Sequence, residues 1–288
     1  MDEPSPDTVF YFYWGLNAAF LIPFLKKKNK KIACRFHGYD LYDERNNGYL
    51  PFQSSIVKNC DIIMPCSEHG AKYLKAKYST YDIKVFVTRL GTISKGLAKM
   101  GNDDVFHLIS CSSVISVKRV QIIAECLQYI NSNIQWTHIG DGDLLESLKS
   151  EVASMNLKNI EVNFMGRLPP EKVQEYYVTS PCDLFLNVSE YEGVPVSIME
   201  AFSAGIPAFA TDVGGTSEIV DKSVGKLLGK DITPPELAFF IDQYRKLDQK
   251  HKMKMRENAF SRFEELCNIS ENTRRLSEVL KFDSQLKS

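Results

Sequence analysis

Short apolar runs alternate with longer amphipathic segments along most of this chain. Runs rich in β-branched and aromatic residues occur at 31–36, 61–66, 84–88, 105–111, 134–140, 160–166, 183–188 and 206–211. Segments of helical periodicity lie between or after the later runs, at 119–131, 143–155, 170–178, 196–204 and 234–247. Strands that are apolar throughout suit parallel sheets with both faces covered. The alternation therefore predicts a doubly wound α/β fold.

One internal boundary interrupts this pattern. Residues 91–104 are rich in Gly, Ser, Lys and Asp, as expected of a linker. The series of βα units after it gives residues 99–267 the pattern of a complete Rossmann-like domain. Residues 1–98 contain fewer strands and are expected to form a truncated N-terminal Rossmann-like domain. A C-terminal helix over about 268–288 is a candidate to pack back on that first domain.

The composition narrows the class of protein. With 44% apolar and 25% charged residues, the chain has the composition of a soluble globular protein. Its 35 Lys and Arg residues balance 36 Asp and Glu residues, so no overall field favours nucleic acid as a partner. The seven cysteines include no CxxC pair. We therefore expect a reducing, cytoplasmic compartment, with neither disulfides nor a zinc site.

The apolar segment 10–25 resembles a membrane span or a signal peptide only superficially. It is shorter than the ~20 residues that a span requires, and it contains Asn17 and Pro23. Its lysines, at 26–31, follow the apolar part, whereas those of a signal peptide precede it. We predict a helix that is partly core and partly interfacial. Its aromatic residues and lysines could rest on an anionic membrane surface.

Residues 189–211 have the pattern of a strand, a polar turn and a helix that binds phosphate. The helix is expected to begin near Pro195, because proline is favourable at the first helical position. The free amides of Val196 and Ser197 would then face an anion. Glu200 lies about one turn further along in an apolar helix, where its carboxylate needs a partner. Paired ribose hydroxyls would donate hydrogen bonds to it. On spacing alone, two surface glutamates flanking a core helix remain the favoured interpretation.

The wider pattern reverses that preference. Glu192-x7-Glu200 is followed by Ala201, Gly205, Pro207 and Gly214-Gly215-x-x-Glu218. This pattern resembles the signature of family 4 glycosyltransferases, which are retaining enzymes with the two-Rossmann GT-B fold, and the resemblance covers nearly all of the chain. It implies that Glu200 binds the donor ribose and that Glu192 holds hydroxyls of the donor sugar. It also implies that the donor site includes Gly193, Val196 and Ser197.

A second cluster follows the strand at 105–111. Members of the family usually have an Arg and, further on, a Lys that clamp the donor diphosphate. Here Ser113 stands in place of the Arg, Lys118 matches the Lys, and Arg119 follows where Gly is common. A cation is needed because the leaving diphosphate gains charge as the glycosidic bond breaks. We expect Lys118, with Arg119, to supply that charge; the alternative is an exposed Lys-Arg pair.

Two glycines follow the strand at 134–139. Gly140 and Gly142 let backbone approach a ligand closely, and by resemblance this loop lies near the nucleotide, with Arg167 and Leu168 beside the base. The DxD pair in this loop sits in a Gly-rich turn, which argues against a metal site. The third glycine of a dinucleotide fingerprint is absent, which disfavours an NAD-linked oxidoreductase. His37 resembles the HG-x-D element whose His contacts the donor sugar; a His capping a strand end is the alternative.

The resemblance implies a retaining hexosyltransferase with Glu192, His37 and Lys118 as catalytic residues. It would move a sugar from a nucleotide-sugar donor, UDP in preference to GDP, to a glycan or lipid-linked acceptor in surface polysaccharide biosynthesis. Neither a metal nor a cofactor is expected, and the enzyme would be cytoplasmic, peripheral on the inner face of the membrane.

Family members usually begin with a strand and a Gly-rich turn well before the position that matches Val9. The alternative is a nucleotide-sugar-binding subunit, or a truncated inactive enzyme, that needs a partner chain to complete its N-terminal domain.

Overall fold

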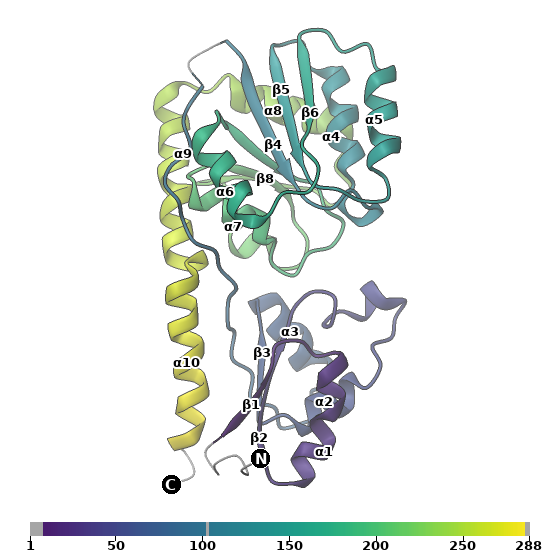
Figure 1. Ribbon diagram of the computed structural model, residues 1–288, viewed down its shortest axis with the longest axis vertical. Coiled ribbons are helices and arrows are strands. Elements are labelled where there is room, and N and C mark those ends of the chain that lie inside the picture. Colours follow the sequence, from purple (N-terminus) through teal and green to yellow (C-terminus); the bar gives the residue numbers. More distant parts are fainter. Residues whose placement is uncertain (1–7, 102–103, 286–288) are drawn as a thin grey trace. The chain divides into compact units, whose positions relative to one another are not determined.

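The computed structural model describes residues 8–101 and 104–285, and these form two compact units (Figure 1). The first contains residues 8–91, 192–194 and 269–285; the second contains 92–101, 104–191 and 195–268. The sequence-based boundary at 98/99 thus falls inside the second unit. The reason is that Thr92 donates from its amide to the carbonyl of Cys267 at 2.8 Å, and Ala98 to that of Ala204 at 2.8 Å. Parts of the predictions over 1–98, 91–104 and 268–288 lie outside the described residues.

The first unit contains a three-stranded parallel sheet in the order β1-β2-β3. Its strands are β1 (Val9–Phe12), β2 (Lys31–Phe36) and β3 (Ile62–Pro65). Its helices are η1 (Asn17–Leu21), α1 (Ile22–Lys27), η2 (Asp43–Asn46), α2 (Gln53–Asn59), α3 (Glu68–Lys77) and α10 (Ile269–Gln285).

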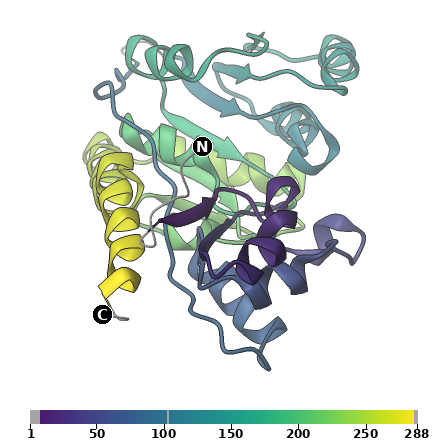
Figure 2. The same ribbon diagram turned by 60° about the horizontal axis from the view of Figure 1, so that its bottom comes forward.

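Both faces of this sheet are covered, as the apolar character of its strands predicts. Alternate side chains of β2 and β3 point to opposite faces. Ile32, Cys34, Phe36 and Ile63 pack with side chains of α1, α2 and α3. Ala33, Ile62 and Met64 pack with Leu276, Val279 and Leu280 of α10. Figures 1 and 2 show α10 on one side of the strands and α1–α3 on the other.

The prediction of a single helix over residues 10–25 is wrong. Residues 9–12 instead form β1, which pairs in parallel register with β2, Val9 opposite Lys31. A short run of aromatic residues is compatible with either a strand or a helix. Residues 9–12 form a strand because they pair with β2. Gly15 then turns the chain against Phe36, and α1 begins with Pro23 in its first turn. No helix within 8–101 or 104–285 is both long and apolar enough to cross a bilayer.

The second unit contains a six-stranded parallel sheet in the order β6-β5-β4-β7-β8-β9. Its strands are β4 (Phe106–Cys111), β5 (Ile134–Ile139), β6 (Ile160–Phe164), β7 (Leu184–Asn187), β8 (Ala208–Thr211) and β9 (Gly225–Leu228). Its helices are η3 (Ser116–Lys118), α4 (Val120–Cys126), η4 (Leu127–Tyr129), α5 (Leu145–Ser154), α6 (Pro170–Thr179), α7 (Val196–Ser203), η5 (Thr216–Glu218), α8 (Pro234–Arg245), α9 (Gln249–Arg262) and the π-helix η6 (Phe263–Cys267).

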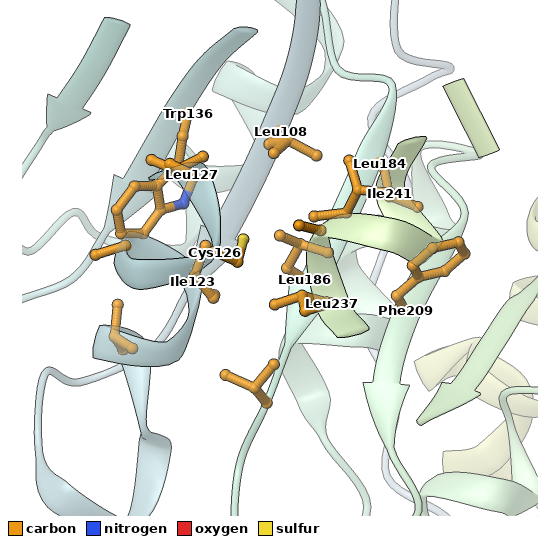
Figure 3. Close-up of a cluster of buried hydrophobic side chains, with 14 of the residues drawn as sticks. Leu108, Ile123, Cys126, Leu127, Trp136, Leu184, Leu186, Phe209, Leu237 and Ile241 are labelled. Atoms are coloured by element: carbon orange, nitrogen blue, oxygen red, sulfur yellow. The ribbon is translucent and has the colours of Figure 1, made fainter. Parts of the chain in front are cut away.

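The main core of this unit lies between the sheet and helices α4, α5 and α8 (Figure 3). Trp136 of β5 is fully buried there, with Ile123 of α4 and Ile241 of α8 in the same cluster. Burial of a large apolar side chain contributes roughly 2–3 kcal/mol to folding. On the opposite face, Tyr177 of α6 packs edge-on against Phe185 of β7, with ring centroids 6.4 Å apart. The doubly wound α/β prediction is therefore confirmed for this unit.

Two other strand predictions need correction. Residues 84–88 form no strand, although they lie beside β3 through one bridge between Ile63 and Val85. Conversely, β9 was not predicted, because a strand of four residues at the sheet edge, starting with glycine, carries little apolar signal.

Candidate functional site

The sheet of the second unit has a topological switch point between β4 and β7. The chain leaves β4 for β5 and then β6, and returns to β7 on the other side of β4. In open α/β sheets, ligands bind beyond the carboxyl ends of the strands at such a point. The loops that follow β4, β5, β6 and β7 are therefore the place to look for a site.

A pocket of about 630 Å³ lies at this edge. It is lined by Cys111, Ser112, Ser113, Ile139, Gly140, Asp141, Gly142, Asp143, Arg167, Leu168 and Val173. Five residues predicted for the donor site, Ser113, Gly140, Gly142, Arg167 and Leu168, thus share one cavity.

Backbone hydrogen bonds fix the walls of this pocket. The amide of Val114 donates to the carbonyl of Asp141 at 2.9 Å, which joins the loops after β4 and β5. The amide of Gly140 donates to the carbonyl of Gly166 at 2.8 Å, which joins the loops after β5 and β6. The three loops therefore form one rigid rim, as a preorganised binding site requires.

Gly140 is required by this rim, and its replacement is the first prediction. Its φ is +153°, and a Cβ added there would lie 1.8 Å from the carbonyl oxygen of Ser112. Gly140→Ala is expected to lower stability by roughly 3 kcal/mol, because both backbone strain and a backbone clash must be relieved. Gly166→Ala is the matched control, since Gly166 also has a positive φ, +65°, but nothing lies within 4 Å of the added Cβ.

Thermal unfolding of the two variants separates the two effects. Gly166→Ala should lose only about 1 kcal/mol, the usual cost of a left-handed backbone for a residue with a side chain. Equal losses in the two variants would show that the close approach to Ser112 is not what makes Gly140 necessary.

Helix α7 begins where the sequence predicted. Pro195 is its N-cap, and the amides of Ile198 and Met199 donate to the Pro195 carbonyl at 3.1 and 3.4 Å. The amides of Val196 and Ser197 donate no hydrogen bond within the described residues. Free amides at a helix start favour an anion.

The carboxylate of Glu200 lies in an apolar environment on α7. Burial raises its pKa from 4.5 to about 7. Among the described residues, no hydrogen bond or ion pair is recorded for this carboxylate. Its charge acts electrostatically on the thiol of Cys111 and the hydroxyl of Tyr177. A carboxylate left without a partner in such a place suits a ligand that brings hydroxyl donors.

Lys118 and Glu200 both act electrostatically on Cys111. Burial raises the pKa of the Cys111 thiol to about 12; Glu200 raises it further and Lys118 opposes the rise. Both charges therefore act on Cys111, which lines the pocket.

Arg119 is directed away from the pocket lining. Its Nε donates to the carbonyl of Val188, at the end of β7, at 2.8 Å, and its Nη2 is buried without a hydrogen-bond partner among the described residues. Burial lowers the pKa of the guanidinium, while Glu190 and Asp231 oppose that change. The φ of Arg119 is +48°, the left-handed region that favours glycine, so the residue retains a strained backbone for the sake of its side chain.

The remaining predicted residues belong to the first unit, namely His37, Glu192 and Gly193. His37 follows β2 directly and is 6% exposed, and Glu192 is 9% exposed. Among the described residues, no three or more His, Cys, Asp or Glu side chains are grouped so that they could hold a metal ion.

Several residues of the site were missed from the sequence, among them Cys111 and His138. Cys111 lines the pocket but looks like an ordinary core thiol at the end of an apolar strand. His138 supports the wall, because its Nε2 lies 3.2 Å from the carbonyl oxygen of Ser112 and its Nδ1 lies 2.8 Å from Ser110 Oγ. Burial lowers the pKa of His138 to about 4, so it is neutral near pH 7. Alternation along β5 places it in the sheet, but no motif distinguishes it.

Comparison with known proteins identifies relatives of this chain. The curated relatives include the amylovoran biosynthesis glycosyltransferase AmsK of Erwinia amylovora, 24% identical over 259 residues, which cover 83% of this chain and 61% of that protein. They also include the putative colanic acid biosynthesis glycosyltransferase WcaL of Escherichia coli, 25% identical over 266 residues, 87% of this chain and 64% of that protein. The chain thus spans about three fifths of the length of these relatives.

Solved structures show the same fold. The sucrose-phosphate synthase of Thermosynechococcus elongatus matches with a TM-score of 0.78 at 17% identity, covering 95% of this chain and 73% of that one. The Anabaena protein HepE, solved in complex with UDP, matches with a TM-score of 0.77 at 16% identity, covering 95% and 78%. These likenesses establish an α/β fold with parallel sheets of the GT-B type.

The family assignment rests on the unit that carries the pocket. The family model described as "Glycosyl transferases group 1" matches residues 98–262, which is more than half of the chain and includes β4 to α9. The match contains the pocket lining, Lys118, Glu200 and the start of α7. The chain therefore belongs to the glycosyl transferases group 1 family.

Proposed function

We propose that this chain transfers a sugar from a nucleoside-diphosphate donor to an acceptor hydroxyl with retention of the anomeric configuration, and that the donor is a UDP-sugar in preference to a GDP-sugar. The observation that supports this most directly is Glu200. Its carboxylate is half-buried and acts on Cys111, which lines the pocket at the switch point, and ribose hydroxyls would supply the hydrogen bonds that the chain does not. The base would occupy the pocket beside Arg167 and Leu168.

The diphosphate is proposed to bind at the start of α7, on the amides of Val196 and Ser197, with Lys118 as the principal cation. In the reaction, the bond from the anomeric carbon to the phosphate oxygen breaks, and its electron pair leaves with the diphosphate. Positive charge near that oxygen stabilises the transition state. The acceptor oxygen bonds to the anomeric carbon on the same face, and its proton passes to the leaving phosphate. This reaction needs neither a metal nor a cofactor.

His37 and Glu192 are proposed to contact the donor sugar, as the family resemblance implies. Arg119 is proposed to contribute less than Lys118, because the hydrogen bond of its Nε to the carbonyl of Val188 holds the guanidinium. The relatives named for amylovoran and colanic acid biosynthesis support a surface-polysaccharide acceptor, either a glycan or a lipid-linked sugar.

The donor proposal is tested by calorimetric titration of the purified chain with UDP-glucose, UDP-N-acetylglucosamine and GDP-mannose. We expect saturable binding of at least one UDP-sugar that Glu200→Ala removes. Binding of none of the three, or equal binding by Glu200→Ala, would reject the proposal. Release of the free sugar from a bound donor, followed by chromatography, shows whether the chain also breaks the glycosidic bond.

A donor-binding subunit that requires a partner chain is a second candidate. It is supported by the streptococcal GtfA subunit among the relatives, 24% identical over 236 residues, and by the likeness to a solved GtfA/B complex, with a TM-score of 0.74. Donor binding without transfer or hydrolysis, restored by a co-expressed chain, would favour this candidate.

Residues 20–28 are proposed to rest on the inner surface of the membrane. Leu21 and Phe24 are 57% and 65% exposed and lie one helical turn apart, and Phe52, 63% exposed, packs on Phe20 beside them. Lys27 is the last residue of the same short helix, and Lys28 caps its C-terminus. Aromatic residues next to lysines suit an anionic bilayer. Sedimentation with anionic liposomes should carry the protein down, and recovery in the supernatant would exclude this proposal.

A further inference from the structure

Two hydrogen bonds join the loop after β4 to the loop after β7, one on each side of Lys118. The amide of Glu190 donates to the carbonyl of Val117 at 2.8 Å. The Nε of Arg119 donates to the carbonyl of Val188, also at 2.8 Å. We call these two hydrogen bonds the loop clamp. They fix the residues immediately before and immediately after Lys118 to the end of β7.

The loop after β7 is a firm support for the clamp. Val188 and Ser189 are only 1% and 2% exposed. Thr211 of β8 donates from its Oγ1 to the carbonyl of Ser189 at 2.5 Å, and the amide of Ser189 donates to Oδ1 of Asn187 at 3.1 Å. Because this loop is buried and bonded to β8, hydrogen bonds to it limit the motion of the loop that carries Lys118.

The backbone of Arg119 is strained, and the strain has a use. Arg119 lies between η3, which carries Lys118, and α4, with a φ of +48°. Glycine would adopt this left-handed conformation without strain, but it has no side chain to reach Val188. The cost of the arginine is thus accompanied by a hydrogen bond that a glycine could not make, which indicates a role for the side chain.

The charge of Arg119 is offset by two carboxylates. Glu190 and Asp231 raise the pKa of its guanidinium against the opposing effect of burial. Less of that charge is therefore left to act on a phosphate. Its Nη2 is buried without a hydrogen-bond partner among the described residues, so direct contact with a phosphate is the competing interpretation. The two roles differ in what they predict for a variant that lacks Lys118.

We propose that Arg119 is a positioning residue, which holds Lys118 in place through the loop clamp and acts on the leaving diphosphate only through Lys118. The proposal rests on the proposed function, in which Lys118 is the principal cation. A fixed charge stabilises a transition state where it is already in position, and a small displacement of such a group slows the reaction. The clamp links the placement of Lys118 to β7, which pairs with β4 at the switch point.

Amide hydrogen exchange tests the clamp independently of turnover. Arg119→Gly removes the side chain and suits the left-handed backbone, so the variant should unfold within about 3 °C of the wild type. Exchange of the Glu190 amide should become at least about tenfold faster. The amide of Val114, which bonds to Asp141 in the pocket rim, is the internal control and should keep its rate. An unchanged rate at Glu190 would overturn the proposal.

A double-mutant cycle tests the action through Lys118. Initial rates of transfer or donor hydrolysis are measured for Arg119→Gly, Lys118→Ala and the double variant. Arg119→Gly should lower kcat about tenfold and change donor KM less than about twofold. In the Lys118→Ala background the same change should lower kcat less than about twofold, because the group that Arg119 holds is already absent.

Asn159→Gly is the matched control for the backbone. Asn159 is exposed and also left-handed, with a φ of +58°, so the change relieves strain without removing a clamp. This variant should unfold about 2 °C above the wild type and keep its kcat.

Multiplicative losses in the double variant would overturn the proposal and show that Arg119 acts on the phosphate by itself. Wild-type kcat in Arg119→Gly would overturn it as well. Failure of the proposed function is a different result: wild-type kcat in Lys118→Ala, or no turnover and no UDP-sugar binding by the wild type. Either of these also removes the role proposed for Arg119 in the reaction, whereas the exchange rate at Glu190 still decides whether Arg119 ties the two loops.

Discussion

Replacing Glu200 by glutamine should abolish sugar transfer and, at the same time, stabilise the protein at neutral and alkaline pH. The ribose hydroxyls would lose a charged acceptor, and two charge-assisted hydrogen bonds correspond to at least about a hundredfold loss of donor affinity. The gain in stability has a different cause. Burial raises the pKa of Glu200 to about 7, so its ionised form costs folding energy that a neutral amide does not.

Because the pKa of Glu200 is raised on folding, the stability of the wild type should fall as pH rises. The pKa of Glu200 is higher in the folded chain than its ordinary value of 4.5. Below about pH 4.5 the group is protonated in both states and carries no penalty, so wild type and Glu200→Gln should be equally stable. As pH rises to about 7 the wild type loses stability relative to the variant, and above that the difference stays at about 3 kcal/mol.

Thermal unfolding at several pH values, with UDP-glucose titrations on the same samples, tests both effects. Glu146→Gln is a matched control, since Glu146 is exposed on α5 and pairs only with Lys149 at the surface. A variant that still binds donor, or a stability difference that does not grow between pH 5 and 7, would contradict the assignment of Glu200.

Replacing Lys118 by alanine should slow transfer by about 10²–10³, mainly through kcat, because a fixed charge acts most strongly on the leaving diphosphate. Donor KM should change less, since the amides at the start of α7 still bind the phosphates. Lys118→Arg should recover part of the rate, because the charge is kept and its geometry altered.

The control for this variant is Lys149→Ala, which removes a lysine from the exposed face of α5. Initial rates of transfer, or of donor hydrolysis, with the UDP-sugar that binds best provide the measurement. Unchanged turnover in Lys118→Ala would remove Lys118 from the proposed mechanism. Loss confined to KM would make it a binding residue only.

The sequence by itself determined the frame of the second unit. Strands β4 to β8 could be predicted because buried parallel strands are apolar on both faces. Such a strand is visible in the sequence without knowledge of the strand it pairs with. The start of α7 at Val196 was found because Pro195 marks it locally. Five of the residues that line the pocket were also predicted, since glycines and polar residues after consecutive parallel strands must gather at one edge of the sheet.

Other features depended on contacts between distant parts of the chain. The run at 9–12 is a strand only because β2 pairs with it. Arg119 follows Lys118 in the sequence, yet its side chain bonds a carbonyl 69 positions away. The raised pKa of Glu200 arises from the burial that folding imposes on it.

There is a physical reason why some features were predictable from the sequence and others were not. Periodicity, turn residues and helix starts are local, so the sequence carries them directly. The direction of a side chain, the solvent around a carboxylate and the pairing of a short strand are set by neighbours that only the tertiary structure brings together. For this chain the sequence therefore predicted the loops that line the pocket, and the tertiary structure decided how Glu200 is buried and how Tyr13 and Trp14 come to pack on His37.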